Sequence, residues 1–193
     1  AQEAGQALRT TFGIATKIAK TNAEAQKYWA MRRESFNLLR KRIRGLRTAP
    51  FIDDLVVAPE HLSKFLPKLE TILHKHPNMI YTVAGHMGDG NFHIIPLMDP
   101  NDPSLADTIR EVAGRVYDLV LSYNGSISGE HNDGMVRGPY VRQMFGDEVY
   151  KLFQETEHIF DPDDIFNPGK KVGVTLDESL EHLDANTKIS HRG

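Results

Sequence analysis

The sequence contains no cysteine among its 193 residues. This absence excludes disulfides, iron–sulfur ligation and thiol nucleophiles within the chain, so any metal ion must be bound by histidine and carboxylate side chains. The chain also lacks an excess of positive charge, because its formal net charge is −3, and we therefore expect no nucleic-acid partner. No apolar run approaches the roughly 20 residues that span a bilayer. These absences favour a cytoplasmic location, with peripheral attachment to a membrane as the alternative.

Hydrophobic residues make up 40% of the sequence, which is enough to bury the core of one domain. Apolar periodicity and turn residues predict both helices and strands. The predicted helices span residues 23–39, 60–74 and 105–123, with one or two more over 141–160. The predicted strands span residues 51–57, 79–84, 92–98 and 126–128, and the second and third form a hairpin. This order favours an α+β fold whose mostly antiparallel sheet is covered by helices.

The strongest chemical signal is the segment HMGDGNFH at residues 86–93. If the strands on either side pair, we expect His86 and His93 to stand across from each other near the hairpin tip, with Cβ atoms about 5 Å apart. One metal ion could then bind a nitrogen from each ring. Asp89 and Asn91 could orient the two imidazole rings by hydrogen bonds, without touching the metal themselves. The alternative is a plain hairpin in which His86 caps the turn and His93 is a half-buried strand residue.

A second cluster, SGEH at residues 128–131, follows the end of a predicted strand. It supplies a carboxylate beside an imidazole, which are the groups needed for a third metal ligand and for a proton acceptor. Two histidines and one glutamate would leave coordination positions open, as catalytic metal sites do, and they suit Zn, Mn, Fe or Co. The alternative is a solvated loop with two ordinary polar residues.

The strings HMGDGNFH, SGEH and FNPGKK, in this order, resemble the C-terminal domain of the FAD-linked oxidases, a family that includes D-lactate, glycolate and D-2-hydroxyglutarate dehydrogenases. The resemblance covers residues 23–172 and implies the ferredoxin-like cap domain of that family, which binds substrate and metal, over residues 1–173. Residues 174–193 are expected to form a polar tail with too few apolar residues for a packed element.

The activity that the resemblance implies is flavin-dependent oxidation of a D-2-hydroxy acid to the 2-oxo acid, with hydride transfer to FAD. The implied partners are a small 2-hydroxy acid and the FAD-binding domain of the same polypeptide, with an iron–sulfur or other electron-transfer protein as a further candidate. Nothing in this sequence resembles that FAD-binding domain. We therefore expect the chain by itself to bind metal but little or no FAD.

The family's metal and base residues map onto the two motifs. In the family, the two motif histidines and the glutamate of SGEH bind a divalent metal, which implies His86, His93 and Glu130 as ligands. The histidine after that glutamate lies near flavin and substrate and is the proposed base. The resemblance therefore implies His131 as both a catalytic and a flavin-contacting residue.

Two further strings carry the family's substrate and flavin contacts. An arginine in a W-x-x-R helix holds the substrate carboxylate, and the string WAMR at residues 29–32 implies Arg32 in this role, with Arg33 as a second candidate. The NPGK turn approaches the flavin in the family, which implies Asn167 and Lys170.

The sequence departs from the family pattern at three positions. Asn132 follows SGEH, where members often have glycine. Members that accept a dicarboxylic hydroxy acid tend to have a lysine before the strand aspartate and an asparagine two residues after the second motif histidine. This chain has Ile52 and Ile95 there, which favours a smaller or more apolar acid, similar to lactate or glycolate, over 2-hydroxyglutarate.

Two other functions use the same residues differently. A site of two histidines and a glutamate can activate water, so a metal-dependent hydrolase is one alternative. A non-catalytic interaction module with a purely structural hairpin is the other. Metal-dependent turnover of esters or amides would indicate the first, and failure to bind zinc or manganese at His86 and His93 would indicate the second.

Overall fold

A computed structural model describes residues 1–13, 15–42 and 45–183. The chain divides into two compact units, residues 1–45 and 46–193. The first contains helices α1 (Gln2–Phe12) and α2 (Asn22–Arg42). Helix α2 confirms the helix predicted over residues 23–39. Helix α1 was not predicted, although it ends as helices often do, at a glycine with left-handed backbone, Gly13 (φ 65°).

The second unit is built on an antiparallel sheet. Its strands are β1 (Arg47–Thr48), β2 (Ile52–Val56), β3 (Ile80–His86) and β4 (Asn91–Met98). Strand β4 pairs with each of the others, with β3 along one edge and β2 and β1 in succession along the other. The predicted hairpin and the predicted antiparallel sheet are therefore confirmed.

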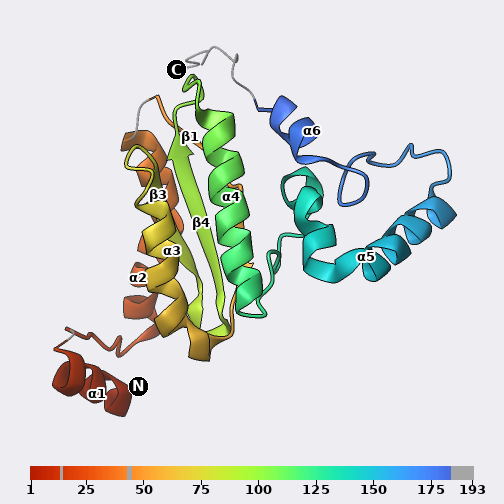
Figure 1. Cartoon of the computed structure of the whole chain (residues 1–193). Helices are drawn as coiled ribbons and strands as arrows, with labels where there is room; N and C mark the ends of the chain where they lie inside the picture. The colour runs from red at the N-terminus through yellow and green to blue at the C-terminus, as the bar shows by residue number, and fades with distance from the viewer. Residues whose placement is uncertain (14, 43–44, 184–193) are drawn as a thin grey trace. The chain divides into compact units, whose positions relative to one another are not determined.

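Two helices cover one face of this sheet. Helix α3 (Leu62–Leu73), which follows the short 3-10 turn η1 (Pro59–His61), lies beside α4 (Leu105–Ser122) in front of β4 (Figure 1). Their apolar stripes bury against alternate residues of the strands, which is the arrangement expected when a sheet has one face in the core. The principal buried side chains are Leu55, Phe65, Leu69, Leu73, Phe92, Ile94, Val112, Val116 and Val120. The predicted α+β fold is confirmed.

Alternation along β4 decides where its polar residues lie. Phe92 and Ile94 belong to the core, so His93, between them, points to the face of the sheet that α3 and α4 do not cover. Successive side chains of a strand point to opposite faces, and a side chain on the face opposite to α3 and α4 can meet a ligand without disturbing the core. The motif histidine is therefore placed for binding.

Two predictions for the C-terminal part need correction. The strand predicted over residues 126–128 is reduced to a single bridge between Val56 and Ser126. The tail is not without structure, because α6 (Leu176–Glu181) forms there and its leucines pack against the core. A capping box between Thr175 and Glu178 begins this helix, so local capping compensates for the low apolar content.

Helix α5 (Gly134–Phe160) accounts for the one or two helices predicted over residues 141–160, but it begins earlier. Its backbone leaves the helical region at Gly146 (φ 79°, ψ 168°), so it consists of two helices joined by a kink. In the described ranges, no helix combines the length and the apolar character needed to cross a membrane.

Candidate active site

A β-bulge brings two aspartates to the face of the sheet opposite to α3 and α4. Ile52 pairs with Ile94 and Leu55 pairs with Phe92, so Asp53 and Asp54 together stand opposite the single residue His93. Such a bulge re-aims side chains, and bulges are frequent beside active sites. Asp54 adopts a left-handed backbone (φ 65°), which aspartate tolerates better than most residues. In the sequence this Asp-Asp pair looks only like an interruption of a strand.

Asp54 holds the SGEH loop in place. Its carboxylate accepts hydrogen bonds from the backbone N–H groups of Gly129 (2.8 Å), Glu130 (3.0 Å) and His131 (2.8 Å), and from the side chain of Asn91 (3.0 Å). The residue is completely buried, with 0% of its surface exposed. Burial opposes the charged form, but these hydrogen bonds outweigh it and hold the pKa of Asp54 below its ordinary value. A charged Asp54 therefore determines where Glu130 and His131 lie.

Gly129 fits this loop because it has no side chain. A Cβ atom there would lie 2.5 Å from Nδ2 of Asn91 and 2.8 Å from Oδ1 of Asp54. We expect Gly129→Ala to lower the free energy of unfolding by about 1–3 kcal/mol, as overpacking does. Urea unfolding measures this change. The matched control is Gly88→Ala in the hairpin turn, where a Cβ would meet nothing within 4 Å, and an equal loss in both variants would contradict the prediction.

The two motif histidines lie diagonally on the hairpin. The strand register pairs His86 with Asn91 and His93 with Ala84, so the expectation that the histidines stand directly across from each other is wrong. The physical reason is the turn, because the 3-10 turn η2 (Met87–Asp89) and Gly90 occupy four residues. Both histidines still lie on one face, with ring centroids 6.4 Å apart.

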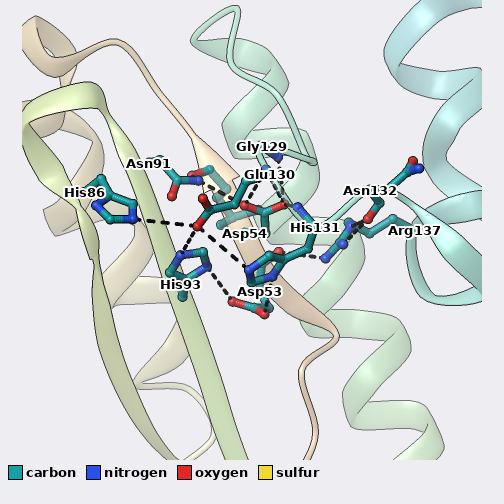
Figure 2. A network of polar contacts seen from close by, with 11 residues as sticks. Asp53, Asp54, His86, Asn91, His93, Gly129, Glu130, His131, Asn132 and Arg137 are labelled. Atoms are coloured by element: carbon teal, nitrogen blue, oxygen red, sulfur yellow. Dashed lines mark hydrogen bonds and ion pairs between the residues drawn. The ribbon is translucent and has the colours of Figure 1, made fainter. Parts of the chain in front are cut away.

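Glu130 lies at the centre of three imidazoles. Its Oε1 is 3.1 Å from Nε2 of His93, 3.8 Å from Nε2 of His86 and 3.8 Å from Nε2 of His131. Figure 2 shows the three rings arranged around this carboxylate. The ligand atoms of His86, His93 and Glu130 all lie within 4.8 Å of one another. The structure thus brings together the three residues that the motifs predicted as ligands, with His131 beside them.

The residue that orients the rings is not one that the sequence predicted. Asp53 contacts Nδ1 of His93 at 3.0 Å and Nδ1 of His131 at 3.2 Å. Asn91 instead donates its amide to Asp54 and to the backbone oxygen of Leu55, and η2 carries Asp89 in the turn. The expected role of Asp89 and Asn91 behind the imidazoles is therefore taken by Asp53.

The donor set fits a divalent cation. Nitrogen and oxygen ligands bound at about 2.1 Å to one ion lie roughly 3.0–3.4 Å apart, depending on coordination geometry. The separation of 3.1 Å between His93 and Glu130 is in this range, and His86, at 3.8 Å, would need a small approach.

The side chain of Asn91 is a second indication that this site binds a polar ligand. Its Oδ1 is buried and finds no hydrogen-bond partner among the described residues. The amide cannot simply be turned over, because Nδ2 faces two acceptors, the Asp54 carboxylate and the Leu55 carbonyl. Asn91 lies beside His86 and Glu130 (Figure 2), so a cation with its water could satisfy this oxygen.

Asp53, His93 and His131 form another group whose ligand atoms lie within 4.8 Å of one another. In this group the contacts use Nδ1 of both rings, and hydrogen bonds to the carboxylate already account for them. Only 12% of the Asp53 side chain is exposed, which leaves little room for a substrate. The set formed by His86, His93 and Glu130 is more open and suits a catalytic ion better.

Arg137 is a buried residue whose role could not be seen in the sequence. Its guanidinium donates to the backbone oxygen of Asp53 at 3.1 Å and, through two nitrogens, to that of Asn132. It therefore ties the bulge of β2 to the loop after His131. No local pattern signals the contact with Asp53, because it joins segments 84 residues apart.

The remaining predicted residues lie elsewhere in the chain. Arg32 belongs to the first unit, on α2, with its guanidinium 5.8 Å from the ring of Trp29, and Arg33 is its neighbour on that helix. Asn167 and Lys170 lie in the exposed turn after α5, where Lys170 contacts the backbone oxygen of Pro168. The roles of these residues at the site therefore stay predictions.

Comparison with known proteins identifies the family. The chain matches the model for "FAD linked oxidases, C-terminal domain" over residues 1–171. The chain belongs to this family. The resemblance recognised in the motifs is therefore confirmed.

Individual relatives agree with this assignment. The chain is 29% identical to a D-2-hydroxyglutarate dehydrogenase of Escherichia coli (strain K12) over 157 residues, covering 81% of this chain and 15% of the relative. It is 33% identical to a D-2-hydroxyglutarate dehydrogenase of Pseudomonas putida over 153 residues, with 79% and 15% covered. It is 28% identical to the glycolate oxidase subunit GlcD of Escherichia coli (strain K12) over 158 residues, with 81% and 30% covered. The chain thus spans less than a third of each of these relatives.

Proposed function

We propose that this chain is the substrate- and metal-binding domain, over residues 1–173, of a flavin-dependent dehydrogenase that oxidises a D-2-hydroxy acid. The observation that carries the proposal is the convergence of three imidazole nitrogens on Oε1 of Glu130, within a domain of the FAD-linked oxidase family. His86, His93 and Glu130 would hold a divalent metal such as Zn, Mn or Fe. When bound, such a cation polarises the hydroxyl of the substrate and makes its proton more acidic.

His131 is the proposed base. Its Nδ1 faces Asp53, so its Nε2 points to the side of the cluster where Glu130 lies and where a hydroxyl group would approach. There it would accept the hydroxyl proton, while the hydrogen on the carbon that bears the hydroxyl would leave with its electron pair to the flavin of the FAD-binding domain, which gives the 2-oxo acid. Arg32 is proposed to hold the substrate carboxylate through two parallel N–H groups, a geometry that lysine cannot reproduce.

The proposed substrate is a small or apolar 2-hydroxy acid with one carboxylate. Ile52 is fully buried in the core and so cannot contact a second carboxylate. Arg137, which lies close to the cluster, already donates to two backbone oxygens, of Asp53 and Asn132. Both observations support a lactate- or glycolate-like acid, although two of the relatives named above are D-2-hydroxyglutarate dehydrogenases.

The proposed partner is an FAD-binding domain of the same polypeptide, with Asn167 and Lys170 approaching the flavin. An apolar surface around their turn supports this proposal, since Ile159, Phe160 and Phe166 are exposed by 73%, 79% and 66%. Exposed aromatic and aliphatic side chains in such a group usually mark a surface that another domain covers. Electron transfer to an iron–sulfur or other protein, in the cytoplasm or at a membrane surface, completes the proposal.

Replacing His131 with alanine tests the role of the base. In the flavin-containing polypeptide, we expect His131→Ala to lower kcat by about 10²–10⁴-fold, which is the usual contribution of a positioned base. Metal content should remain, because His131 is not among the three proposed ligands. The measurements are steady-state turnover of D-lactate and glycolate together with metal analysis, and unchanged turnover would remove His131 from the mechanism.

A further inference from the structure

The geometry points to Lys171 as a positioning residue that fixes the angle between the two halves of helix α5. This role deepens the proposed function, on which it rests. The loop of Glu130 and His131 comes before the first residue of α5, and the turn of Asn167 and Lys170 comes after its last. The angle within α5 therefore sets where the proposed base lies relative to the proposed flavin contacts.

The backbone of α5 does not fix this angle by itself. Gly146 leaves the helical region at φ 79° and ψ 168°, and glycine adopts many neighbouring conformations at little cost. Figure 1 shows the chain leaving the far end of α5 and turning back toward α6. The returning segment can supply the contacts that hold the two halves in one arrangement.

Lys171, in this returning segment, binds the start of α5. Its Nζ lies 2.5 Å from Oδ2 of Asp133, the N-cap residue, and its backbone N–H donates to the oxygen of Gly134 at 3.2 Å. The Asp133 side chain is only 5% exposed. Loss of the ammonium group would therefore leave a buried carboxylate without its cation, which is far more damaging than breaking an ion pair at the surface.

The same segment also contacts the second half of α5. The ammonium group of Lys171 lies 5.5 Å from the centre of the Phe153 ring, within the range of a cation–π interaction. Two residues further on, the N–H of Gly173 donates to the hydroxyl of Tyr150 at 3.1 Å. Both aromatic residues follow Gly146, so one ammonium group contacts α5 on both sides of the kink.

The backbone of Lys171 is a further indication that its side chain is used. Its φ of 71° lies in the left-handed region, which lysine rarely adopts and glycine adopts readily. Such strain persists where the surrounding contacts determine the conformation, and it clusters at functional positions. The ammonium contacts of Lys171, which glycine could not make, account for lysine at this position.

A second ion pair crosses the kink, but it lies at the surface. Nε of Arg142 is 2.6 Å from Oδ1 of Asp147, and the two side chains are 63% and 76% exposed. An exposed pair of this kind contributes little. Arg142→Met is therefore the matched control for Lys171→Met, because it also removes a cation that crosses the kink.

The angle matters for the proposed reaction because hydride transfer requires reacting atoms within about 3–3.5 Å of each other. A change in the kink would move the flavin contacts relative to His131 without altering either. Asp54 would still hold the N–H groups of Glu130 and His131. We therefore expect loss of the Lys171 contacts to slow the reaction and to leave metal binding intact.

Spin-label distance measurements test the positioning in the chain by itself, without metal or flavin. Because the sequence has no cysteine, Ser63→Cys in α3 and Asp163→Cys after α5 give two unique labels at exposed positions. The distance distribution should be narrow in this labelled chain, and Arg142→Met should leave it unchanged. Lys171→Met should broaden or shift it, and Lys171→Arg, which keeps the cation, should restore it.

Asp133→Asn keeps the size of the residue and removes its charge, so it should change the distribution in the same direction. This second variant decides the question if Lys171→Met does not fold. An unchanged distribution in the variants that fold would overturn the proposal.

Single-turnover reduction of the flavin by saturating D-lactate or glycolate gives a second measurement, in the flavin-containing polypeptide. We expect Lys171→Met to slow reduction by about 10–100-fold, as a misplacement of about 1 Å can, with KM and bound metal unchanged. Lys171→Arg should recover most of the rate. A raised KM with an unchanged rate of reduction would contradict the positioning role. Failure of the unaltered polypeptide to reduce its flavin would instead refute the proposed function, and the distance measurement would still decide the role of Lys171.

Discussion

Asp54→Ala is expected to lower the free energy of unfolding by on the order of 3 kcal/mol, because it leaves one buried donor and three partly buried donors without their acceptor. The donors are the N–H groups of residues 129–131 and the amide of Asn91, which all meet this one carboxylate. Loss of the carboxylate should also release Glu130 and His131 from the cluster. Urea unfolding measures the first effect, and zinc titration measures the second.

Asp54→Asn should be less damaging, since it keeps one acceptor and tolerates the left-handed backbone. Asp107→Ala, an exposed aspartate in α4, is the control for loss of charge. The role assigned to Asp54 in the loop would be wrong if Asp54→Ala were as stable as this control.

The same carboxylate predicts how stability depends on pH. Its pKa is lower in the folded chain than its ordinary value of 3.8. A group of this kind stabilises the fold fully above its unfolded pKa, and the stabilisation is lost as the pH falls through the lower folded value. The free energy of unfolding should therefore fall as the pH drops below about 4. In Asp54→Asn, the part of this pH dependence that is due to Asp54 should be missing.

His93→Ala is expected to weaken binding of zinc or manganese by more than the roughly 100-fold that loss of an outer partner costs. His93 makes the shortest contact to Glu130, at 3.1 Å, and is the least exposed of the three proposed ligands. Its loss removes one of the three proposed ligands and leaves only His86 and Glu130 to hold the ion. Isothermal titration of the purified chain measures the affinity.

His74→Ala provides the matched control, because His74 also lies near a glutamate, Glu70, but on the exposed end of α3. The His74→Ala variant should bind zinc or manganese as tightly as the unaltered chain. If His93→Ala retained the same affinity as His74→Ala, the cation site would not be at this cluster.

The residues that could be predicted from the sequence are those whose signal is local. HMGDGNFH and SGEH are short strings, and the hairpin that carries the first is specified by its own turn. The helices over α2, α3 and α4 follow from periodicity in the same way. The predicted ligands His86, His93 and Glu130 are accordingly found together.

The supporting residues could not be predicted because their roles depend on contacts between distant segments. Asp53 and Asp54 act through a bulge that exists only once β2 pairs with β4, and Asp54 reaches a loop 75 residues away. In the sequence the same pair only interrupts an apolar run. The role of Arg137 could not be predicted for the same reason, because its contact with Asp53 joins distant segments. The diagonal placement of His86 depends on the length of the hairpin turn, which the motif does not specify.

The central claim is that one cation lies between two imidazoles and a carboxylate on the face of the sheet opposite to α3 and α4. The most direct test is a crystal structure of the zinc-loaded chain with anomalous diffraction measured at the zinc edge. We predict one strong peak about 2.0–2.2 Å from nitrogens of His86 and His93 and an oxygen of Glu130. A peak bound instead by Asp53 and His131, or no peak at the cluster from crystals saturated with zinc, would contradict the claim.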